Sequence, residues 1–244
     1  MKKWVLGLFA ALFVFILSAC QQEREPIDLV VVGLGDSLTE GIGDEEKLGG
    51  YFGRLVEKLS EDEMVEEVTS YNFGKSGHRS EQLLERIKQE EEIRDALKKA
   101  DIVTMTIGGN NIVKVVRQHL LRLEMKPFEK EHSRYEEDLQ AIVKEIESLN
   151  PNVSLFLGGV YNPLDMVSEE EAEFTEIIQG WNETIQQVSK QDNRTFISLE
   201  HLGEDPVESY YSTDYFHPNG IGYEVIADRF YHEVQQKLKE AFDE

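Results

Sequence analysis

The chain has 244 residues, and its 48 acidic side chains outnumber its 25 basic ones, so the formal net charge at pH 7 is −23. So acidic a protein is repelled by nucleic acid, anionic lipid and wall polymer, which excludes non-specific nucleic-acid binding. Cys20 is the only cysteine, which excludes an intramolecular disulfide. The fold therefore depends on its hydrophobic core alone.

The first twenty residues have the pattern of an export signal. Two lysines precede an apolar run over residues 4–19, which is too short for a comfortable membrane span. The run ends at Leu17–Cys20, whose sequence LSAC resembles a bacterial lipobox. This resemblance implies cleavage before Cys20 and a diacylglyceryl thioether on its sulfur. We expect a signal peptide over residues 1–19, a lipidated tether over 20–26 and attachment to the extracytoplasmic face of the cell membrane; a single transmembrane anchor is the alternative.

The remaining chain, residues 27–244, has a length that suits one α/β domain with its own core. Apolar runs rich in β-branched residues predict strands at Ile27–Gly33, Val68–Phe73, Asp101–Ile107, Val153–Gly158 and Arg194–Leu199. Helical patterns occur at Tyr51–Leu59, Ser80–Gln89, Ile93–Lys99, Tyr135–Leu149, Phe174–Lys190 and Pro218–Phe242. The continuous apolar runs indicate strands covered on both faces. Their alternation with helices predicts a three-layer α/β/α sandwich around a mainly parallel, five-stranded sheet.

Polar residues that are suited to catalysis follow the first predicted strand. There the sequence Gly35-Asp36-Ser37-Leu38 offers Ser37 as a nucleophile at the carboxyl end of the sheet, where α/β folds place their sites. The alternative is that Asp36 and Ser37 only cap the next helix. The spacing lacks the second glycine of a Gly-x-Ser-x-Gly elbow, so the chain does not fit the α/β-hydrolase signature.

Two further polar segments follow the second and third predicted strands. Gly77 would let a backbone N–H approach a bound substrate closely, although Gly74 is a rival and an ordinary loop glycine is the alternative. Asn110, in Gly108–Asn111, offers amide donors without a charge, unless it is a simple turn or cap residue. Both residue types are suited to stabilising an oxyanion.

The last segment, Asp214–His217, precedes the final predicted helix. Pro218 biases His217 away from helical dihedrals and fits the first turn of that helix. The carboxylate and the imidazole therefore lie in one turn, where Asp214 can orient the ring. A structural Asp–His turn is the alternative.

In this order, the four segments resemble the SGNH/GDSL hydrolases, the GDSL lipase/esterase family. The resemblance implies a flavodoxin-like SGNH hydrolase fold with Ser37, Asp214 and His217 as catalytic residues. It also implies an oxyanion hole built from the N–H groups of Ser37 and Gly77 and the amide of Asn110.

The chain departs from the family at Asn111, where aspartate is typical. Any salt bridge that this aspartate makes in the family is therefore in doubt here, whereas the chemistry is not.

We therefore predict a serine esterase or lipase that cleaves carboxylic esters through an acyl-serine intermediate. Its expected partners are a small-molecule, glycan or lipid ester and, through Cys20, the membrane; its oligomeric state stays open. A non-catalytic surface-binding lipoprotein and an acyltransferase are the alternatives. No cofactor is expected, and the scattered histidines lack the spacing of a metal site.

The fourth predicted strand leads to two candidate substrate-binding residues, Tyr161 and Asn162. The run Ile112–Val116 could form an apolar wall for an acyl chain, but we favour ordinary core packing of a helix for it. The sequence does not choose among lipid, acetylated-sugar and thioester substrates.

Overall fold

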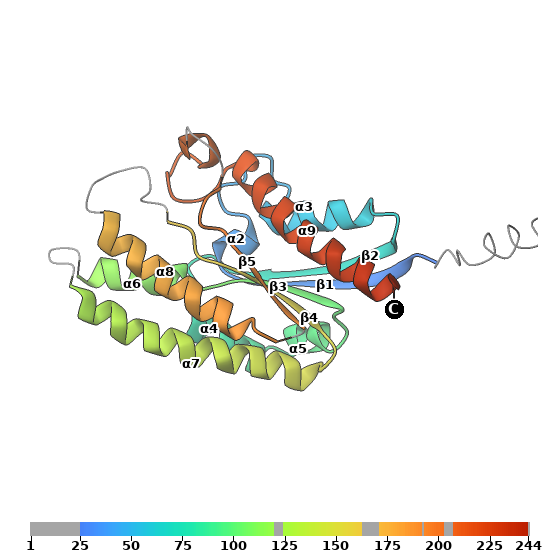
Figure 1. Ribbon diagram of the computed structural model, residues 1–244, viewed down its shortest axis with the longest axis horizontal. Helices are drawn as coiled ribbons and strands as arrows, with labels where there is room; N and C mark the ends of the chain where they lie inside the picture. The colour runs from blue at the N-terminus through green and yellow to red at the C-terminus, as the bar shows by residue number, and fades with distance from the viewer. Residues whose placement is uncertain (1–24, 120–123, 163–170, 192, 203–206, 244) are drawn as a thin grey trace, which may run out of the picture.

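The computed structural model describes residues 25–119, 124–162, 171–191, 193–202 and 207–243. The predicted signal peptide and Cys20 lie outside these residues. The central sheet consists of β1 (Ile27–Gly35), β2 (Val65–Gly74), β3 (Ile102–Thr106), β4 (Ser154–Gly158) and β5 (Arg194–Ile197). Their order is β2-β1-β3-β4-β5, and every neighbouring pair is parallel (Figure 1). The predicted five-stranded parallel sheet is confirmed.

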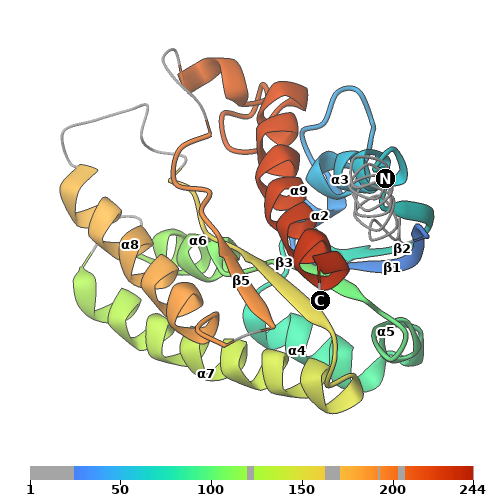
Figure 2. The same ribbon diagram turned by 45° about the vertical axis from the view of Figure 1, so that its right-hand side comes forward.

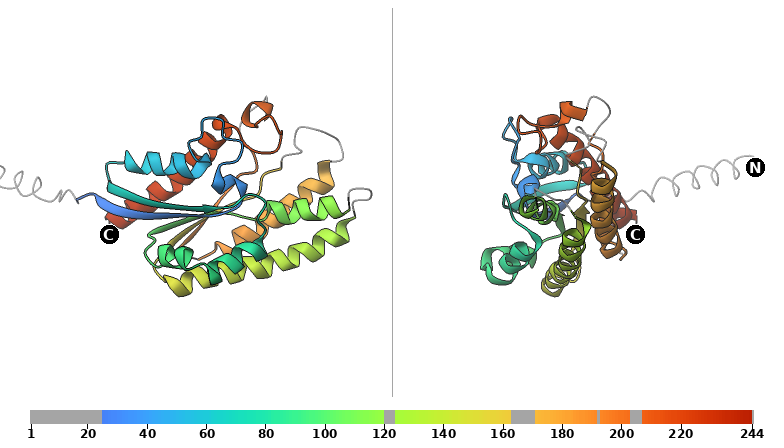
Figure 3. Two further views of the ribbon diagram at one scale, coloured as in Figure 1. Left: turned by 180° about the vertical axis from the view of Figure 1, so that it is seen from behind. Right: turned by 90° about the vertical axis from the view of Figure 1, so that its left-hand side faces the viewer.

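Helices cover both faces of this sheet. They are α2 (Ser37–Glu40), α3 (Gly50–Ser60), α4 (Ser80–Gln89), α5 (Glu91–Leu97), α6 (Gly109–Gln118), α7 (Met125–Leu149), α8 (Glu171–Val188) and α9 (Gly220–Asp243), with a 3-10 turn at Val207–Tyr210. The helices α2, α3 and α9 lie on one face, and α4 to α8 lie on the other (Figures 1 and 3). The predicted three-layer α/β/α sandwich is confirmed.

Alternation of side chains along each central strand produces two hydrophobic cores. In β1, Val31 packs toward α3 and α9, whereas Val32 packs toward α4 to α8. In β4, Phe156 likewise packs toward α3 and α9, and Leu155 packs toward α4 to α8. Because side chains alternate across a strand, a run that is apolar throughout fills the core on both faces of the sheet.

The strand β2 is the exception to the expected burial on both faces. It lies at the edge of the sheet, and its residues Glu66, Glu67, Thr69 and Ser70 are exposed. An edge strand has a neighbour on one side only and carries charged side chains that disfavour pairing with another chain. The expectation of uniformly covered strands is therefore wrong for β2.

The two ends of the sheet have different surroundings. The start of β1 lies beside the C-terminal part of α9, since Ile27 and Leu238 line the same surface groove (Figure 2). The polar segments that follow β1, β2 and β3 lie at the opposite, carboxyl end (Figure 1). Among the residues described, no helix has the length and apolar character needed to cross a membrane.

Candidate active site

Ser37 is the first residue of α2, directly beyond the carboxyl end of β1. The turn into this helix is tight. Gly35 has φ 135°, and a Cβ there would lie 2.0 Å from the carbonyl oxygen of Thr106. Asp36 caps α2, because its Oδ1 accepts a hydrogen bond from the N–H of Leu38 at 3.1 Å. Ser37 is thus placed by a glycine and a cap, and its N–H lies in the first turn, where it has no partner within the helix.

A hydrogen-bonded group of buried side chains holds the Asp36 carboxyl. Thr106 Oγ1 donates to Asp36 Oδ1 at 3.0 Å and lies 2.8 Å from Thr39 Oγ1. Burial raises the pKa of Asp36 to about 7, even though the hydrogen bonds from Leu38 and Thr106 lower it. Asp36 therefore connects β1, α2 and β3 and fixes the position of the turn that carries Ser37.

The loop after β2 runs beside α2. The N–H of Lys75 donates to the carbonyl of Gly35 at 3.0 Å, and the N–H of Ser76 donates to Glu40 Oε2 at 2.5 Å. Gly77 follows with φ 77°, in the left-handed region that favours glycine, and it is exposed, with no heavy atom within 4 Å of the place that a Cβ would take. A ligand can therefore approach the backbone closely on this side.

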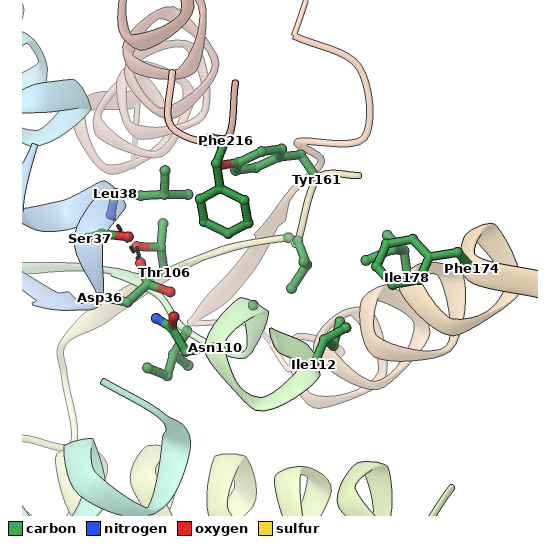
Figure 4. Close-up of a pocket in the computed structure, with 14 residues that line it drawn as sticks. Asp36, Ser37, Leu38, Thr106, Asn110, Ile112, Tyr161, Phe174, Ile178 and Phe216 are labelled. Carbon is green, nitrogen blue, oxygen red and sulfur yellow. Dashed lines mark hydrogen bonds between the residues drawn. The ribbon is translucent and has the colours of Figure 1, made fainter. Parts of the chain in front are cut away.

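Asn110 lies in the first turn of α6, close to the loop that carries Gly77. Its Nδ2 donates to the carbonyl of His78 at 3.1 Å. An amide nitrogen has two hydrogens, so this bond orients the side chain and leaves one donor for a ligand. Asn110 lines the same pocket as Ser37 (Figure 4).

Asn111 is fully buried and joins three helices. Its Oδ1 accepts from the N–H of Ser80 at 3.1 Å, and its Nδ2 donates to Ser80 Oγ at 3.0 Å and to Glu131 Oε1 at 3.1 Å. Lys114 pairs with both oxygens of Glu131, at 2.9 and 3.0 Å. The carboxyl group in contact with Asn111 is that of Glu131 of α7, and Ser80 Oγ in turn donates to Asp138 Oδ2 at 2.8 Å.

Asp214 and His217 form a close pair in the turn before α9. The distance from His217 Nδ1 to Asp214 Oδ2 is 2.6 Å, and Asp214 Oδ1 accepts from Ser212 Oγ and from the N–H groups of Phe216 and His217. Partial burial alone would raise the pKa of Asp214, but these hydrogen bonds hold it well below its usual value. An ionised carboxylate only accepts, so Nδ1 carries the proton and Nε2 is the basic nitrogen.

Contacts on two sides bring this turn to the serine. Phe216 lines the same pocket as Ser37, and its carbonyl accepts a hydrogen bond from the Tyr161 hydroxyl. On the other side, a Cβ at Gly43 would lie 2.8 Å from His217 Cβ. The turn that carries Asp214 and His217 therefore packs between the loop after α2 and the segment after β4.

The pocket at this edge is mostly apolar and is polar only around Ser37 (Figure 4). Tyr161 lines it, whereas Asn162, also buried, lies outside the lining. Gly77 lies outside the lining as well. Ile112 packs in the hydrophobic core and also forms part of the pocket wall. The favoured interpretation, ordinary core packing of a helix, included only the first of these two roles.

Several residues of the site carry no signal of their own in the sequence. Phe174 and Ile178 of α8 line the pocket, and Glu131 of α7 binds Asn111. Each belongs to an ordinary helical pattern, and only the packing of the helices brings it to the site. Within the described ranges, no three His, Cys, Asp or Glu side chains converge in a way that would hold a metal ion.

Comparisons with known proteins identify the family of the chain. Residues 34–225 match the GDSL-like lipase/acylhydrolase family. The chain is 32% identical to the uncharacterized protein YpmR of Bacillus subtilis strain 168, over 97% of this chain and 98% of that protein. It is 25% identical to the spore germination lipase LipC of Bacillus licheniformis, over 82% of this chain and 94% of that one.

Solved structures have the same fold. The lipase Lip_vut3 from a goat rumen metagenome superposes with a TM-score of 0.74 at 25% identity, covering 84% of this chain and 95% of that one. Axe2, an acetyl-xylooligosaccharide esterase from Geobacillus, superposes with a TM-score of 0.63 at 24% identity, covering 86% and 96%. The chain therefore belongs to the GDSL-like lipase/acylhydrolase family, and with it to the carboxylic ester hydrolases.

Proposed function

We propose that the protein is a serine esterase that works through an acyl-serine intermediate, with Ser37 as nucleophile, His217 as base and Asp214 as the residue that orients it. The observation that carries the proposal is the 2.6 Å Asp214–His217 pair in a turn whose Phe216 lines the pocket of Ser37. This combination supplies a nucleophile, a base and a group that orients the base.

Acylation proceeds by a direct exchange of bonds. Nε2 of His217 takes the hydroxyl proton as Ser37 Oγ bonds to the ester carbonyl carbon. The resulting oxyanion is stabilised by the N–H groups of Ser37 and Gly77 and by the free amide hydrogen of Asn110. The bond to the alcohol oxygen then breaks, and His217 returns its proton to the leaving alcohol.

Deacylation reverses the roles. A water molecule gives a proton to His217 and bonds to the acyl carbon. The bond between that carbon and Ser37 Oγ then breaks as His217 returns the proton to Oγ, which releases the acid and restores the free enzyme. Asp214 stays ionised throughout and stabilises the imidazolium form of His217.

We also propose that the chain is anchored through Cys20 to the extracytoplasmic face of the membrane. The support is the apolar run that ends in LSAC. Because β1 begins at Ile27 and ends beside Ser37, its nine residues separate the tether from the site by about 30 Å. A chain anchored by this short tether would direct its pocket away from its own membrane, toward substrates in the surrounding space.

Anchoring is tested by comparing the wild type with Cys20→Ala. We expect metabolically supplied palmitate to label the wild type in the membrane fraction and to leave the variant unlabelled and incompletely processed. Wild-type protein in the medium with a free thiol at Cys20 would contradict the anchor.

The catalytic proposal is tested by replacing Ser37. We expect Ser37→Ala to lose at least about 10⁴-fold in kcat on p-nitrophenyl esters and to stop labelling by a fluorophosphonate. Ser148→Ala, at an exposed position near the end of α7, is the matched control and should keep both. Retained turnover in a folded Ser37→Ala variant would contradict the mechanism. Product analysis with added alcohols separates hydrolysis from acyl transfer.

A further inference from the structure

We propose that the apolar pocket between α6, α8 and the Phe216 turn binds the acyl chain of the ester, and that the preferred acyl groups are straight chains of about four to six carbons. This inference rests on the proposed function, because it starts from Ser37 as the acylated residue. It selects a substrate class, short-chain fatty acyl esters, over acetylated glycans and long-chain lipids.

The division of the pocket into a polar and an apolar end indicates which part of the substrate enters it. Ser37 and Asn110 lie at one end, and Ile112, Phe174 and Ile178 lie at the other (Figure 4). An ester whose carbonyl is held at the polar end has to direct either its acyl part or its alcohol part toward these side chains. The apolar walls match a hydrocarbon chain, which gains from leaving water, and do not match a sugar hydroxyl, which would lose its hydrogen bonds.

The polar groups of the lining already have partners within the protein. Asp36 accepts from Leu38 and Thr106, Asn110 donates to His78, and the Tyr161 hydroxyl donates to Phe216. Of the lining, only the hydroxyl and the N–H of Ser37 and one amide hydrogen of Asn110 are assigned to the ester itself. The lining therefore offers little for recognising an oligosaccharide inside the pocket.

The size of the pocket sets the length of the chain. The described walls leave a space of about 50 Å³ in a pocket that is partly open to solvent. A water-sized group occupies roughly 10–15 Å³, and a methylene is similar in size, so this space suits about three to five methylene-sized groups. With the carbonyl carbon at Ser37, this corresponds to acyl chains from butyryl to hexanoyl.

The wild-type experiment measures kcat/KM for p-nitrophenyl acetate, butyrate, hexanoate, octanoate and laurate, which share one leaving group. Burying a methylene is worth about a fourfold gain, so we expect butyrate to exceed acetate by about tenfold or more. We expect the maximum at butyrate or hexanoate and a decline from octanoate onward, because longer chains exceed the pocket.

Variants at the far end test the wall directly. Ile178 is buried in α8, and Ile178→Trp should fill the pocket and abolish the advantage of hexanoate over acetate, measured as the ratio of their kcat/KM values. Phe174→Ala should move the maximum to octanoate or longer. Gln179→Ala, at the adjacent exposed position of α8, is the matched control and should keep the wild-type order. A thermal melt reports folding in each variant, so a misfolded Ile178→Trp would leave Phe174→Ala to decide.

The outcomes separate this inference from the proposed function. A maximum at acetate, faster cleavage of an acetylated xylo-oligosaccharide than of any p-nitrophenyl ester, or a maximum at laurate would overturn the acyl pocket while leaving the serine mechanism intact. An unchanged chain-length order in both folded α8 variants would also overturn it. Absence of hydrolysis of every ester, together with no fluorophosphonate labelling of Ser37, would instead overturn the proposed function and the acyl pocket with it.

Discussion

The turn that carries His217 and the segment that carries Asn110 lie at the same edge of the sheet, but they are held in different ways. The hydrogen bonds of the Asp214 carboxylate come from Ser212, Phe216 and His217, all within three residues, and the Asp214 side chain is 46% exposed. Asn111, next to Asn110, is fully buried and binds residues 31 and 20 positions away.

This contrast separates catalysis from stability. A turn that is built from local hydrogen bonds near the surface can lose one charged group with little effect on the core. A buried network between α4, α6 and α7 cannot, because an unpaired polar group there has no access to water. Changes in the turn that carries His217 should therefore affect turnover most, and changes around Asn111 should affect stability most.

The largest effect is expected for Asp214→Asn, which tests the catalytic half of this comparison. The variant keeps an acceptor oxygen for the turn but loses the charge that stabilises the protonated imidazole, so we expect kcat to fall about 10⁴-fold. Because the pKa of Asp214 is held well below its usual value, this carboxylate stays ionised from pH 5 to pH 8, so the wild type should keep its advantage over the variant throughout this range.

The measurements for this prediction are a pH profile of kcat/KM and a thermal melt. Loss of the wild-type advantage anywhere between pH 5 and pH 8, or a large loss of stability in the variant, would break the comparison.

A smaller effect is expected for Asn110→Ala, which removes one oxyanion donor. We expect kcat to fall by about 10²–10³-fold, with KM changed much less, because this amide hydrogen binds the transition state more strongly than the ground state. The bond to the carbonyl of His78 is also lost, so a thermal melt should accompany the kinetics. If the fall in kcat were fully explained by a smaller folded fraction of the variant, Asn110 would be a structural residue only.

The comparison predicts the opposite balance for Asn111→Asp. This change places a second carboxylate at the 3.1 Å contact with Glu131 in a buried site, so we expect a loss of roughly 1–3 kcal/mol of unfolding free energy. Turnover of the folded fraction should fall less than in Asn110→Ala.

The double variant Asn111→Asp/Glu131→Gln tests the cause of this loss. It again has one carboxylate at the contact between positions 111 and 131 and a donor facing it, so most of the lost stability should return. Glu137→Gln, at an exposed position of α7, is the control and should rescue nothing. Full destabilisation in the double variant would mean that repulsion between carboxylates is not the reason.

The smallest effect on turnover is expected for Asp36→Asn, which keeps the acceptor that caps α2. Burial raises the pKa of Asp36 to about 7, so the folded state keeps a proton that the unfolded state releases near pH 4. The Asp36 contribution to stability is therefore lost as pH rises toward about 7, by at most about 1.4 kcal/mol per pH unit. The difference in melting temperature, variant minus wild type, should therefore increase as pH rises from 5 to 8.

Asp62→Asn is the control for this pH dependence. The pKa of Asp62 is lowered, because hydrogen bonds from Met64, Gln235 and Tyr231 outweigh its desolvation. Its contribution is lost only as pH falls below the ordinary carboxylate range, so its difference from the wild type should stay constant between pH 5 and pH 8. A constant difference for Asp36→Asn as well would contradict the raised pKa.

The contrast between the two regions also explains how much the sequence could predict. The pair Asp214–His217 followed by Pro218 is a local pattern, and the structure places its side chains in contact as expected. The buried strands were also predicted from a local pattern, since a continuous apolar run indicates a strand that is covered on both faces. The strand β2 was the exception to the predicted burial. Its exposure follows from its place at the edge of the sheet, which depends on the order of the strands in the fold.

The remaining parts of the site depend on the packing of distant helices. Glu131 and Ile178 are ordinary members of helical patterns, and only the arrangement of α6, α7 and α8 brings one to Asn111 and the other to the pocket. No local pattern reports such contacts. Sequence reasoning therefore predicted the residues of the proposed chemistry but missed the network beside Asn110 and most of the pocket wall.

The most direct test of the central claim is to detect the acyl group on Ser37. Wild-type protein mixed with p-nitrophenyl butyrate and quenched in acid within the first turnovers should give a burst of nitrophenol and a butyryl group on the peptide that contains Ser37, as mapped by mass spectrometry. The burst and the modification should both be absent in Ser37→Ala. A butyryl group on another residue, or hydrolysis without any acylated peptide, would contradict the acyl-serine mechanism.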